Sequence, residues 1–330
     1  MIDLRSDTVT RPTPTMRQAM MEAPLGDDVF DDDPTVHRLQ ALAAEMTNKE
    51  AALFVCSGTM SNLLAIMTHC ERGDEYIVGQ SAHTYRYEGG GAAVLGSVQP
   101  QPIENEADGT IALDKIESAI KPDDIVFART RLICLENTIG GKVIAPDYVD
   151  DVARLADRNG LALHLDGARI FNAAVALEVD VAELTRPFDT VSICLSKGLG
   201  APTGSVLCGS QEFITRARRW RKVLGGGWRQ AGLLAAAGII ALTDHVDRLR
   251  VDHELAARLA DGLRKLGLPV DGPHTNQVFV TLSEEATRTL QPFMENRGIQ
   301  LLVRGPTLRL VTHRDLNAED IDAVVEAFGA

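Results

Sequence analysis

The sequence lacks the marks of a secreted, membrane-spanning or nucleic-acid-binding protein. Its five cysteines form no CxxC pair, and their odd number fits no closed disulfide set, so we expect free thiols in a reducing cytoplasm. We expect no signal peptide, and the longest apolar stretch, Leu233–Leu242, is too short to span a bilayer. The net charge of −13 disfavours nucleic-acid or anionic-membrane partners.

Internal repeats are also absent, and the middle of the chain alternates short apolar runs with amphipathic stretches. This alternation predicts an α/β fold with a mostly parallel sheet that helices cover on both faces. We predict strands at Ala51–Cys56, Glu75–Gly79, Leu132–Glu136, Leu161–Asp166, Thr190–Leu195 and Ser205–Gly209. We predict helices at Pro34–Met46, which Asp33 would cap, and at Ser61–Cys70, Asp147–Asn159 and Leu233–Leu242.

The same patterns divide the chain into three parts. Residues 1–25 contain three prolines and little periodicity, so we predict an extended arm over the surface. Residues 26–245 form the large α/β domain, and the pattern then changes to a smaller C-terminal α+β domain, residues 246–330. The small domain is predicted to hold helices His245–Leu266, Glu284–Arg297 and Ala318–Phe328 and strands Gln277–Leu282, Gln300–Val303 and Leu308–Val311.

Two motifs follow buried strands and should meet at one edge of the sheet. Lys197 opens Lys-Gly-Leu-Gly directly after a strand, at the edge where open α/β sheets bind ligands. Burial there favours a neutral amine, which can attack a carbonyl. Asp166 ends the predicted strand Leu161–Asp166, and its carboxylate could hold a proton on a pyridine nitrogen. Arg169 follows one turn later and could bind a hydroxyl or a carboxylate. Each motif also has an ordinary explanation when it is taken singly. Lys197 could be a surface lysine, and Asp166 and Arg169 could form a local ion pair.

A third motif, Ser57-Gly58-Thr59, joins a predicted strand to a predicted helix. The backbone N–H groups of such a helix N-terminus, with the Thr59 hydroxyl, can bind a phosphate, although a plain capped turn also explains the motif. A phosphate cradle, a carbonyl-trapping lysine and a pyridine-holding carboxylate together make the parts of a pyridoxal-phosphate (PLP) site.

Other charged residues are weaker candidates. His83 lies just after the strand Glu75–Gly79 and could stack on a cofactor ring or move a proton. Arg229 follows a glycine run and could reach a phosphate, and Lys222 lies in a basic cluster that a solvated helix face also explains. The acidic run 27–33 lacks the glycine and glutamate of an EF-hand loop, so we predict no metal site.

Together, the motifs described above resemble those of the low-specificity L-threonine aldolases, which are fold-type-I PLP enzymes of the β-eliminating lyase group. The similarity runs nearly from end to end of the chain. The segments that carry it are Asp3–Thr10, Gly26–Val29, Glu50–Ala52, Ser57–Thr59, His164–Arg169, Ser196–Gly200 and Arg309–His313.

The resemblance implies cleavage of L-threonine, L-allo-threonine and related β-hydroxy-α-amino acids to glycine and an aldehyde. It also implies a homotetramer built of dimers that share active sites. Lys197 would be the Schiff-base lysine, Asp166 the partner of the ring nitrogen, and His83 would stack on the ring. The phosphate would be held by Gly58, Thr59 and the partner chain's Arg229, and the substrate carboxylate by Ser6, Arg169 and Arg309; Lys222 and Tyr87 are further candidates for substrate binding.

This sequence departs from the family pattern at two places. Related enzymes often carry a second active-site histidine ahead of a Phe-Ala-Arg-Thr tract, where this chain has Val126, and the usual Glu-Asn-Thr-His-Asn-Gly continues here as Ile139-Gly140-Gly141. The catalytic base therefore stays open between His83 and a water. Three other functions also stay open: another PLP reaction, a lysine aldolase without cofactor, and a non-catalytic binding protein.

Overall fold

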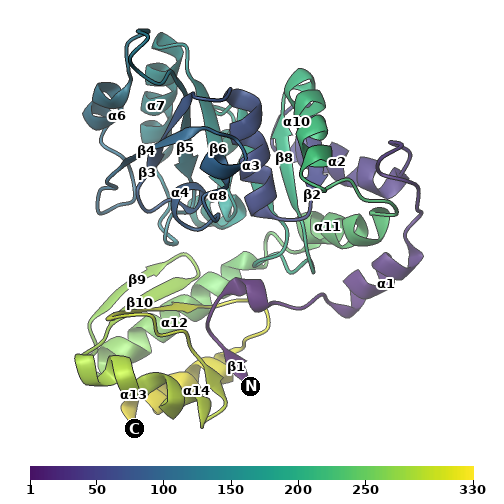
Figure 1. Ribbon diagram of the computed structural model, residues 1–330. Coiled ribbons are helices and arrows are strands. Elements are labelled where there is room, and N and C mark those ends of the chain that lie inside the picture. The colour runs from purple at the N-terminus through teal and green to yellow at the C-terminus, as the bar shows by residue number, and fades with distance from the viewer.

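The computed structural model describes residues 1–330 and contains two sheet-based bodies (Figure 1). The larger body is built on a seven-stranded sheet with the order β2-β8-β7-β6-β5-β3-β4, in which only β8 runs antiparallel to its neighbours. The strands are β2 Ala51–Val55, β3 Glu75–Gly79, β4 Gln99–Ile103, β5 Thr130–Glu136, β6 Ala162–Gly167, β7 Thr190–Cys194 and β8 Ser205–Gly209.

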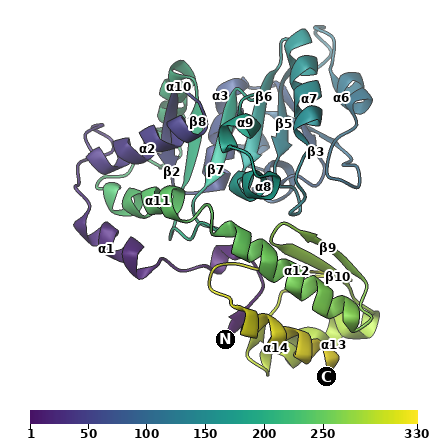
Figure 2. The same cartoon turned by 180° about the vertical axis from the view of Figure 1, so that it is seen from behind.

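Helices cover both faces of this sheet, because both faces of its strands are apolar. Leu53 and Val55 of β2 pack against one helical layer, and Ala52 and Phe54 pack against the other. The first layer holds α3 Gly58–His69, α10 Gln211–Val223 and the short α4 His83–Arg86 and α5 Gly91–Val94. The second layer, in front in Figure 2, holds α2 Pro34–Met46, α6 Leu113–Ala119, α7 Pro146–Arg158, α8 Ile170–Leu177, α9 Val181–Thr185 and α11 Gly232–Asp244.

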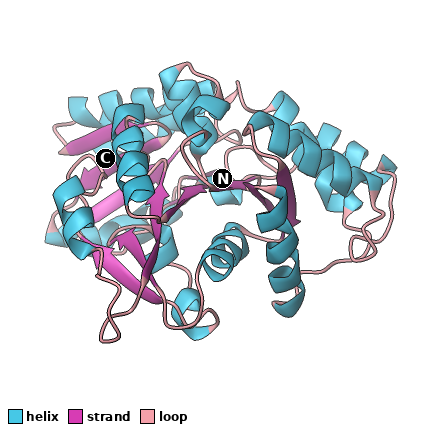
Figure 3. Ribbon diagram, turned by 90° about the horizontal axis from the view of Figure 1, so that it is seen from above, coloured by secondary structure: helices cyan, strands magenta, loops and turns pink.

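The smaller body has its own hydrophobic core around a three-stranded antiparallel sheet, β12-β10-β9. Its strands are β9 Val270–His274, β10 Gln277–Thr281 and β12 Thr307–Val311, and its helices are α12 Leu249–Lys265, α13 Glu284–Glu295 and α14 Ala318–Gly329. A two-residue strand, β1 Ile2–Asp3, pairs in parallel with β11 Ile299–Gln300. Seen from above, helices flank the strands of the molecule on several sides (Figure 3). None of the helices is both long and apolar enough to cross a membrane.

The structure confirms the predicted strands at Glu75–Gly79 and Ser205–Gly209 to the residue. Helix α2 also has its predicted bounds, and Asp33 caps it by accepting hydrogen bonds from the N–H groups of Thr35 and Val36. Edge strand β4 was not predicted, because its two prolines and its polar residues hide it; an edge strand tolerates proline.

The prediction of an extended surface arm at residues 1–25 is wrong in two respects. The backbone of residues 2–4 hydrogen-bonds to β11 and β12, and Leu4 is fully buried in the core of the small body. The segment also forms a short 3₁₀ helix at Asp7–Val9 and the helix α1 Pro14–Glu22, which Thr13 caps. Pairing with residues nearly 300 positions away orders residues 2–4, and local periodicity cannot reveal such a long-range contact.

Candidate active site

The N-terminus of α3 offers unpaired N–H groups at the carboxyl end of β2. Ser57 caps this helix, because its hydroxyl accepts a hydrogen bond from the N–H of Met60. The N–H groups of Gly58 and Thr59 have no partner in the chain, as is usual for the first turn of a helix. The hydroxyl of Ser205 lies beside Gly58, fully buried and without a hydrogen-bond partner. These donors form a cradle that a phosphate would satisfy.

Asp166 lies at the carboxyl end of β6 and is 2% exposed. One of its carboxylate oxygens accepts the N–H of Ala168 at 3.1 Å, and the other accepts the side-chain amide N–H of Asn62 at 2.9 Å. The side chain comes from the face of β6 that packs against α3, because Leu163 and Leu165 occupy the opposite face. Fixed in this way, the carboxylate can accept one further N–H, such as that of a protonated pyridine.

His83 and Glu88 form a hydrogen-bonded pair beside Asp166. The imidazole Nδ1 of His83 lies 2.8 Å from Glu88 Oε1, which also accepts an N–H from Asn62 at 2.8 Å. The hydrogen bond with Glu88 raises the pKa of His83, and burial together with the charge of Asp166 raises the pKa of Glu88. Because Nδ1 donates to Glu88, the other ring nitrogen, Nε2, is left to accept a proton.

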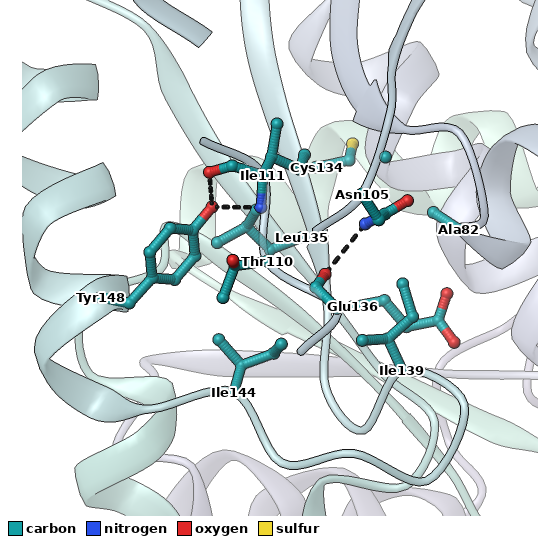
Figure 4. A pocket seen from close by; sticks show the side chains of 12 residues that line it. Ala82, Asn105, Thr110, Ile111, Cys134, Leu135, Glu136, Ile139, Ile144 and Tyr148 are labelled. Carbon is teal, nitrogen blue, oxygen red and sulfur yellow. Dashed lines mark hydrogen bonds between the residues drawn. The ribbon is translucent and has the colours of Figure 1, made fainter. Parts of the chain in front are cut away.

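Glu136 lies beside His83, at the carboxyl end of β5. Its carboxylate accepts the backbone N–H of His83 at 2.7 Å, and burial together with the charge of Asp166 raises its pKa. On one side Glu136 borders a cavity of about 10 Å³, with Asn105, Ile139 and Tyr148 in its walls (Figure 4). That cavity holds at most one water, so a cofactor cannot bind there. The open strand ends that carry Asp166 remain as the ligand-binding region.

Lys197 follows β7, and the loop that carries it is held by two long-range hydrogen bonds. Its carbonyl accepts the hydroxyl of Thr10 at 2.8 Å, and the carbonyl of Leu199 accepts from His245 at 2.7 Å. The Lys197 amine has no ion-pair partner, yet its charge lowers the pKa of Asp7 and opposes the rise in the pKa of Glu136. The amine therefore lies near enough to Asp7 and Glu136 for its charge to act on both carboxyl groups.

Glycine is required three residues after this lysine. Gly200 has a φ of +80°, and a Cβ there would lie 2.8 Å from the guanidinium of Arg314. The Lys-Gly-Leu-Gly motif thus includes a backbone conformation that other residues rarely adopt.

Arg169 and Arg309 lie close together beside the N-terminal segment. Arg169 makes two hydrogen bonds to Asp7, at 2.8 and 2.6 Å, and both side chains are buried. Asp7 also accepts an N–H from Asn276 of the small body, so it links the two bodies. The positive charge of Arg169 adds to burial in lowering the pKa of Arg309. The Ser6 hydroxyl accepts a hydrogen bond from the N–H of Thr8 and so caps the 3₁₀ helix.

The remaining predicted residues lie outside this cluster within one chain. Arg229 pairs with Asp27 at 3.0 Å and does not contact Gly58 or Thr59, and Lys222 lies in the exposed last turn of α10. Tyr87 is 58% exposed and packs its ring near that of His83, with the ring centroids 5.7 Å apart. Val126 is exposed near the amino end of β5, the opposite end from Glu136.

Sequence reasoning missed Asn62, Glu88, Glu136 and His164. Asn62 lies in a helix, 104 residues from Asp166 in sequence, so no local pattern links the two. A usable signal was present in β6, where the polar residues His164 and Asp166 alternate with Leu163 and Leu165. Polar residues with a period of two in a strand that is otherwise apolar indicate a polar partner on the facing helix.

The cluster of His83, Glu88 and Asp166 has the ligand types of a metal site, with ligand atoms within 4.8 Å of one another. The side-chain amide of Asn62, however, donates N–H groups to both carboxylates. An N–H donor occupies the position where a cation would have to sit between them. The cluster therefore suits an N–H-bearing ring better than a metal ion.

Comparison with known proteins places the chain in a family. The family model described as beta-eliminating lyase matches residues 3–285. The chain belongs to the beta-eliminating lyase family. Within this family it is 55% identical over 324 residues to the low specificity L-threonine aldolase of Escherichia coli strain K12, covering 98% of this chain and 97% of that protein. It is 46% identical over 341 residues to low-specificity L-threonine aldolase 1 of Arabidopsis thaliana, covering 99% and 95%.

Solved structures show the same fold in proteins of much lower sequence identity. The threonine aldolase of Leishmania major superposes with a TM-score of 0.85 at 22% identity, over 100% of both chains. A putative L-allo-threonine aldolase from Listeria monocytogenes gives a TM-score of 0.76 at 19% identity, over 96% of this chain and 98% of that one. At such identities the likeness concerns the fold alone, and it confirms the predicted α/β fold of fold-type-I PLP enzymes.

Proposed function

We propose that the chain is a carbon–carbon lyase that cleaves L-threonine, L-allo-threonine and related β-hydroxy-α-amino acids to glycine and an aldehyde, with PLP as its cofactor. The observation that carries this proposal is the placement of Lys197, the buried carboxylate of Asp166 and the unpaired N–H cradle at the carboxyl edge of one sheet. Relatives at 55% and 46% identity carry the name of this activity.

Residues at this edge of the sheet fit three polar positions of the cofactor: its phosphate, its aldehyde and its ring nitrogen. The N–H groups of Gly58 and Thr59 would bind the phosphate, the Lys197 amine would hold the aldehyde carbon, and Asp166 would face the ring nitrogen. His83 would cover one face of the ring. Bound there, PLP supplies an electron-withdrawing ring that takes up the electron pair when the Cα–Cβ bond breaks.

Substrate orientation is assigned to the arginines near the N-terminal segment. Arg309 and the free edge of Arg169 would bind the substrate carboxylate together with Ser6, while Asp7 holds Arg169 in place. Held by these residues, the substrate carboxylate would orient the Cα–Cβ bond for cleavage at the cofactor. Tyr87 and Lys222 would contact the rest of the substrate, which their exposure allows.

His83 is assigned as the base that removes the β-hydroxyl proton. Its Nδ1–H donates to Glu88, which leaves the lone pair of Nε2 to accept that proton. Glu88 then stabilises the imidazolium that forms, because its carboxylate lies 2.8 Å away. Val126, which stands where related enzymes often carry a second histidine, is exposed near the opposite end of β5.

Replacing Glu88 with Gln should shift the pH dependence of cleavage. Gln keeps the shape and an acceptor oxygen but removes the charge that raises the pKa of His83. The acid limb of kcat/KM, which reports deprotonation of His83, should therefore move to lower pH. We expect kcat/KM at the optimum to fall by about tenfold, the cost of one charge-assisted hydrogen bond. Glu106→Gln, at an exposed ion pair with Lys115, is the matched control. Superimposable profiles for wild type and Glu88→Gln would exclude His83 as the base.

The exposed positions of Arg229 and Lys222 support a proposal about the quaternary arrangement. Both are assigned to a neighbouring subunit's site, in a homotetramer built as a dimer of dimers in the cytoplasm. Their exposure and the absence of a contact from Arg229 to the cradle of its own chain support this assignment. Sedimentation of the holoenzyme would give the mass of a tetramer; a monomer with full activity would refute shared sites.

Product analysis tests the reaction class. Purified protein with PLP should release acetaldehyde and glycine in equal amounts from both L-threonine and L-allo-threonine. Pyruvate from serine, or amino transfer to a keto acid, without aldehyde release would instead indicate another PLP reaction of the same group.

A further inference from the structure

A continuous line of buried side chains leads from the surface of the α3 layer to Asp166. From the outer end it comprises His69, Thr190, His164, Asn62 and Asp166, and we call it the His69–Asp166 chain. The successive contacts are 2.9 Å from His69 Nε2 to Thr190 Oγ1, 2.9 Å from there to His164 Nδ1, 3.1 Å from His164 Nε2 to Asn62 Oδ1, and 2.9 Å from Asn62 Nδ2 to Asp166. All but His69 are at most 2% exposed.

Chemistry fixes the direction of every hydrogen bond in the His69–Asp166 chain. Asn62 faces two carboxylates, of Glu88 and Asp166, so the atom that points at them must be its donating nitrogen. Its oxygen then accepts from His164, whose hydrogen must sit on Nε2. His164 Nδ1 is therefore an acceptor, and only the hydroxyl of Thr190 can donate to it.

The outer link follows in the same way. Thr190 has given its single hydrogen to His164, so its oxygen accepts from Nε2–H of His69. Burial lowers the pKa of His164 to about 3, and burial together with the charge of Arg216 lowers that of His69 to about 3, so both rings stay neutral near pH 7. Each ring consequently carries one hydrogen, and each hydrogen is directed toward Asp166.

We propose that the His69–Asp166 chain is a positioning device that orients Asp166 and stabilises its negative charge against the cofactor's ring nitrogen. Four donors point the same way, and aligned hydrogen bonds polarise one another in a low-dielectric interior. Thr190 and His164 act only through Asn62 and do not touch the cofactor. This inference rests on the proposed function for the identity of the cofactor, but the direction of the chain does not.

The network is more than a means of satisfying buried polar groups. A merely structural role would be met by either tautomer of His164, with Asn62 and Thr190 turned to match. The two carboxylates on Asn62 remove that freedom, because turning its amide would place an oxygen against both. The His69–Asp166 chain therefore has a single arrangement of hydrogens, and its last hydrogen bond is donated to Asp166.

A direct test is the tautomeric state of the histidines in the unmutated holoenzyme, read from ¹⁵N NMR of histidine-labelled protein. We expect the rings of His69 and His164 to be neutral, with the hydrogen on Nε2, and not to titrate between about pH 5 and 9. Burial also lowers the pKa of His253, to about 4, so His69→Gln and His253→Gln should each remove one non-titrating signal and separate these from the signal of His164. A hydrogen on Nδ1 of His164, or titration of that ring, would overturn the proposal.

A matched pair of variants tests the effect at the ring. Thr190→Val keeps the shape of the side chain and removes the hydroxyl, while Thr190→Ser keeps the hydroxyl. With ¹⁵N-labelled PLP, Thr190→Val should move the ring-nitrogen signal toward the unprotonated value and weaken PLP binding by about three- to tenfold. Thr190→Ser should stay within about twofold of wild type in PLP affinity, with an unchanged ring-nitrogen signal.

These outcomes distinguish a failure of the positioning role from a failure of the proposed function. Identical ring-nitrogen shifts for Thr190→Val and Thr190→Ser would overturn the positioning role. If the wild type itself bound no PLP, the proposed function would fail, while the histidine tautomers would still report on the direction of the chain. If Thr190→Val does not fold, the tautomer measurement on unmutated protein decides the case.

Discussion

Replacing Lys197 with Ala should abolish cleavage of L-threonine, with a loss of more than about 10³-fold in kcat, because no other residue can supply its function. Lys197 follows β7 at the carboxyl edge of the sheet, and its charge acts on Asp7 and Glu136. The visible absorbance of the bound cofactor should disappear or shift in the same variant. Aldehyde release and the absorption spectrum are the two measurements.

Two control variants separate the covalent role of this lysine from its charge. Lys197→Arg keeps the positive charge beside Glu136 but cannot form a Schiff base, so it should be as inactive as Lys197→Ala. Lys115→Ala removes an exposed lysine that pairs with Glu106 and should behave as wild type. A Lys197→Ala protein that cleaves threonine at the wild-type rate would refute the assignment.

Replacing Asp166 with Asn should lower kcat by about 10²- to 10³-fold, the usual effect of removing one preorganised electrostatic contact. Both oxygens of Asp166 already accept N–H groups, from Ala168 and Asn62. An asparagine has only one acceptor oxygen, so its own N–H would face another N–H and its neutral oxygen would no longer hold a proton on the ring. We expect weaker PLP binding in addition to slower turnover, measured by titration of the apoprotein.

Asp189→Asn is a matched control for this variant. Asp189 precedes β7 and accepts one backbone N–H, from Leu163, at the amino end of the sheet. An asparagine oxygen can accept the same bond, so this substitution should leave both turnover and PLP affinity unchanged. An Asp166→Asn protein with wild-type PLP affinity and turnover would show that the ring nitrogen does not face this residue.

The strands that precede Lys197 and end at Asp166 could be predicted from the sequence, because buried parallel strands have a strong apolar signature. The sequence places both residues directly after such strands, and the structure brings their motifs to one edge of the sheet. By contrast, the first residues of the chain are ordered by pairing with β11. Asp7 accepts hydrogen bonds from Arg169 and from Asn276, which lie far from it in sequence. These contacts join residues that local pattern cannot connect.

The environment of the acid and the base was not predictable from local pattern. Glu88 follows a four-residue helix and appears in sequence as an ordinary loop glutamate. Only the fold brings it within 2.8 Å of the His83 ring and of the Asn62 amide. The pairing matters for function because it leaves Nε2 of His83 as the free nitrogen. Sequence thus predicted the groups that would touch the cofactor better than the groups that orient them.

The central claim is that PLP is bound covalently to Lys197 at the carboxyl edge of the large sheet. Reduction of the purified holoenzyme with borohydride, followed by proteolysis and mass spectrometry, tests it most directly, because reduction makes the Schiff base permanent. We expect the mass of the reduced cofactor on the peptide that contains Lys197 and on no other. A label on a different lysine, or no label on a protein that cleaves threonine, would contradict the account.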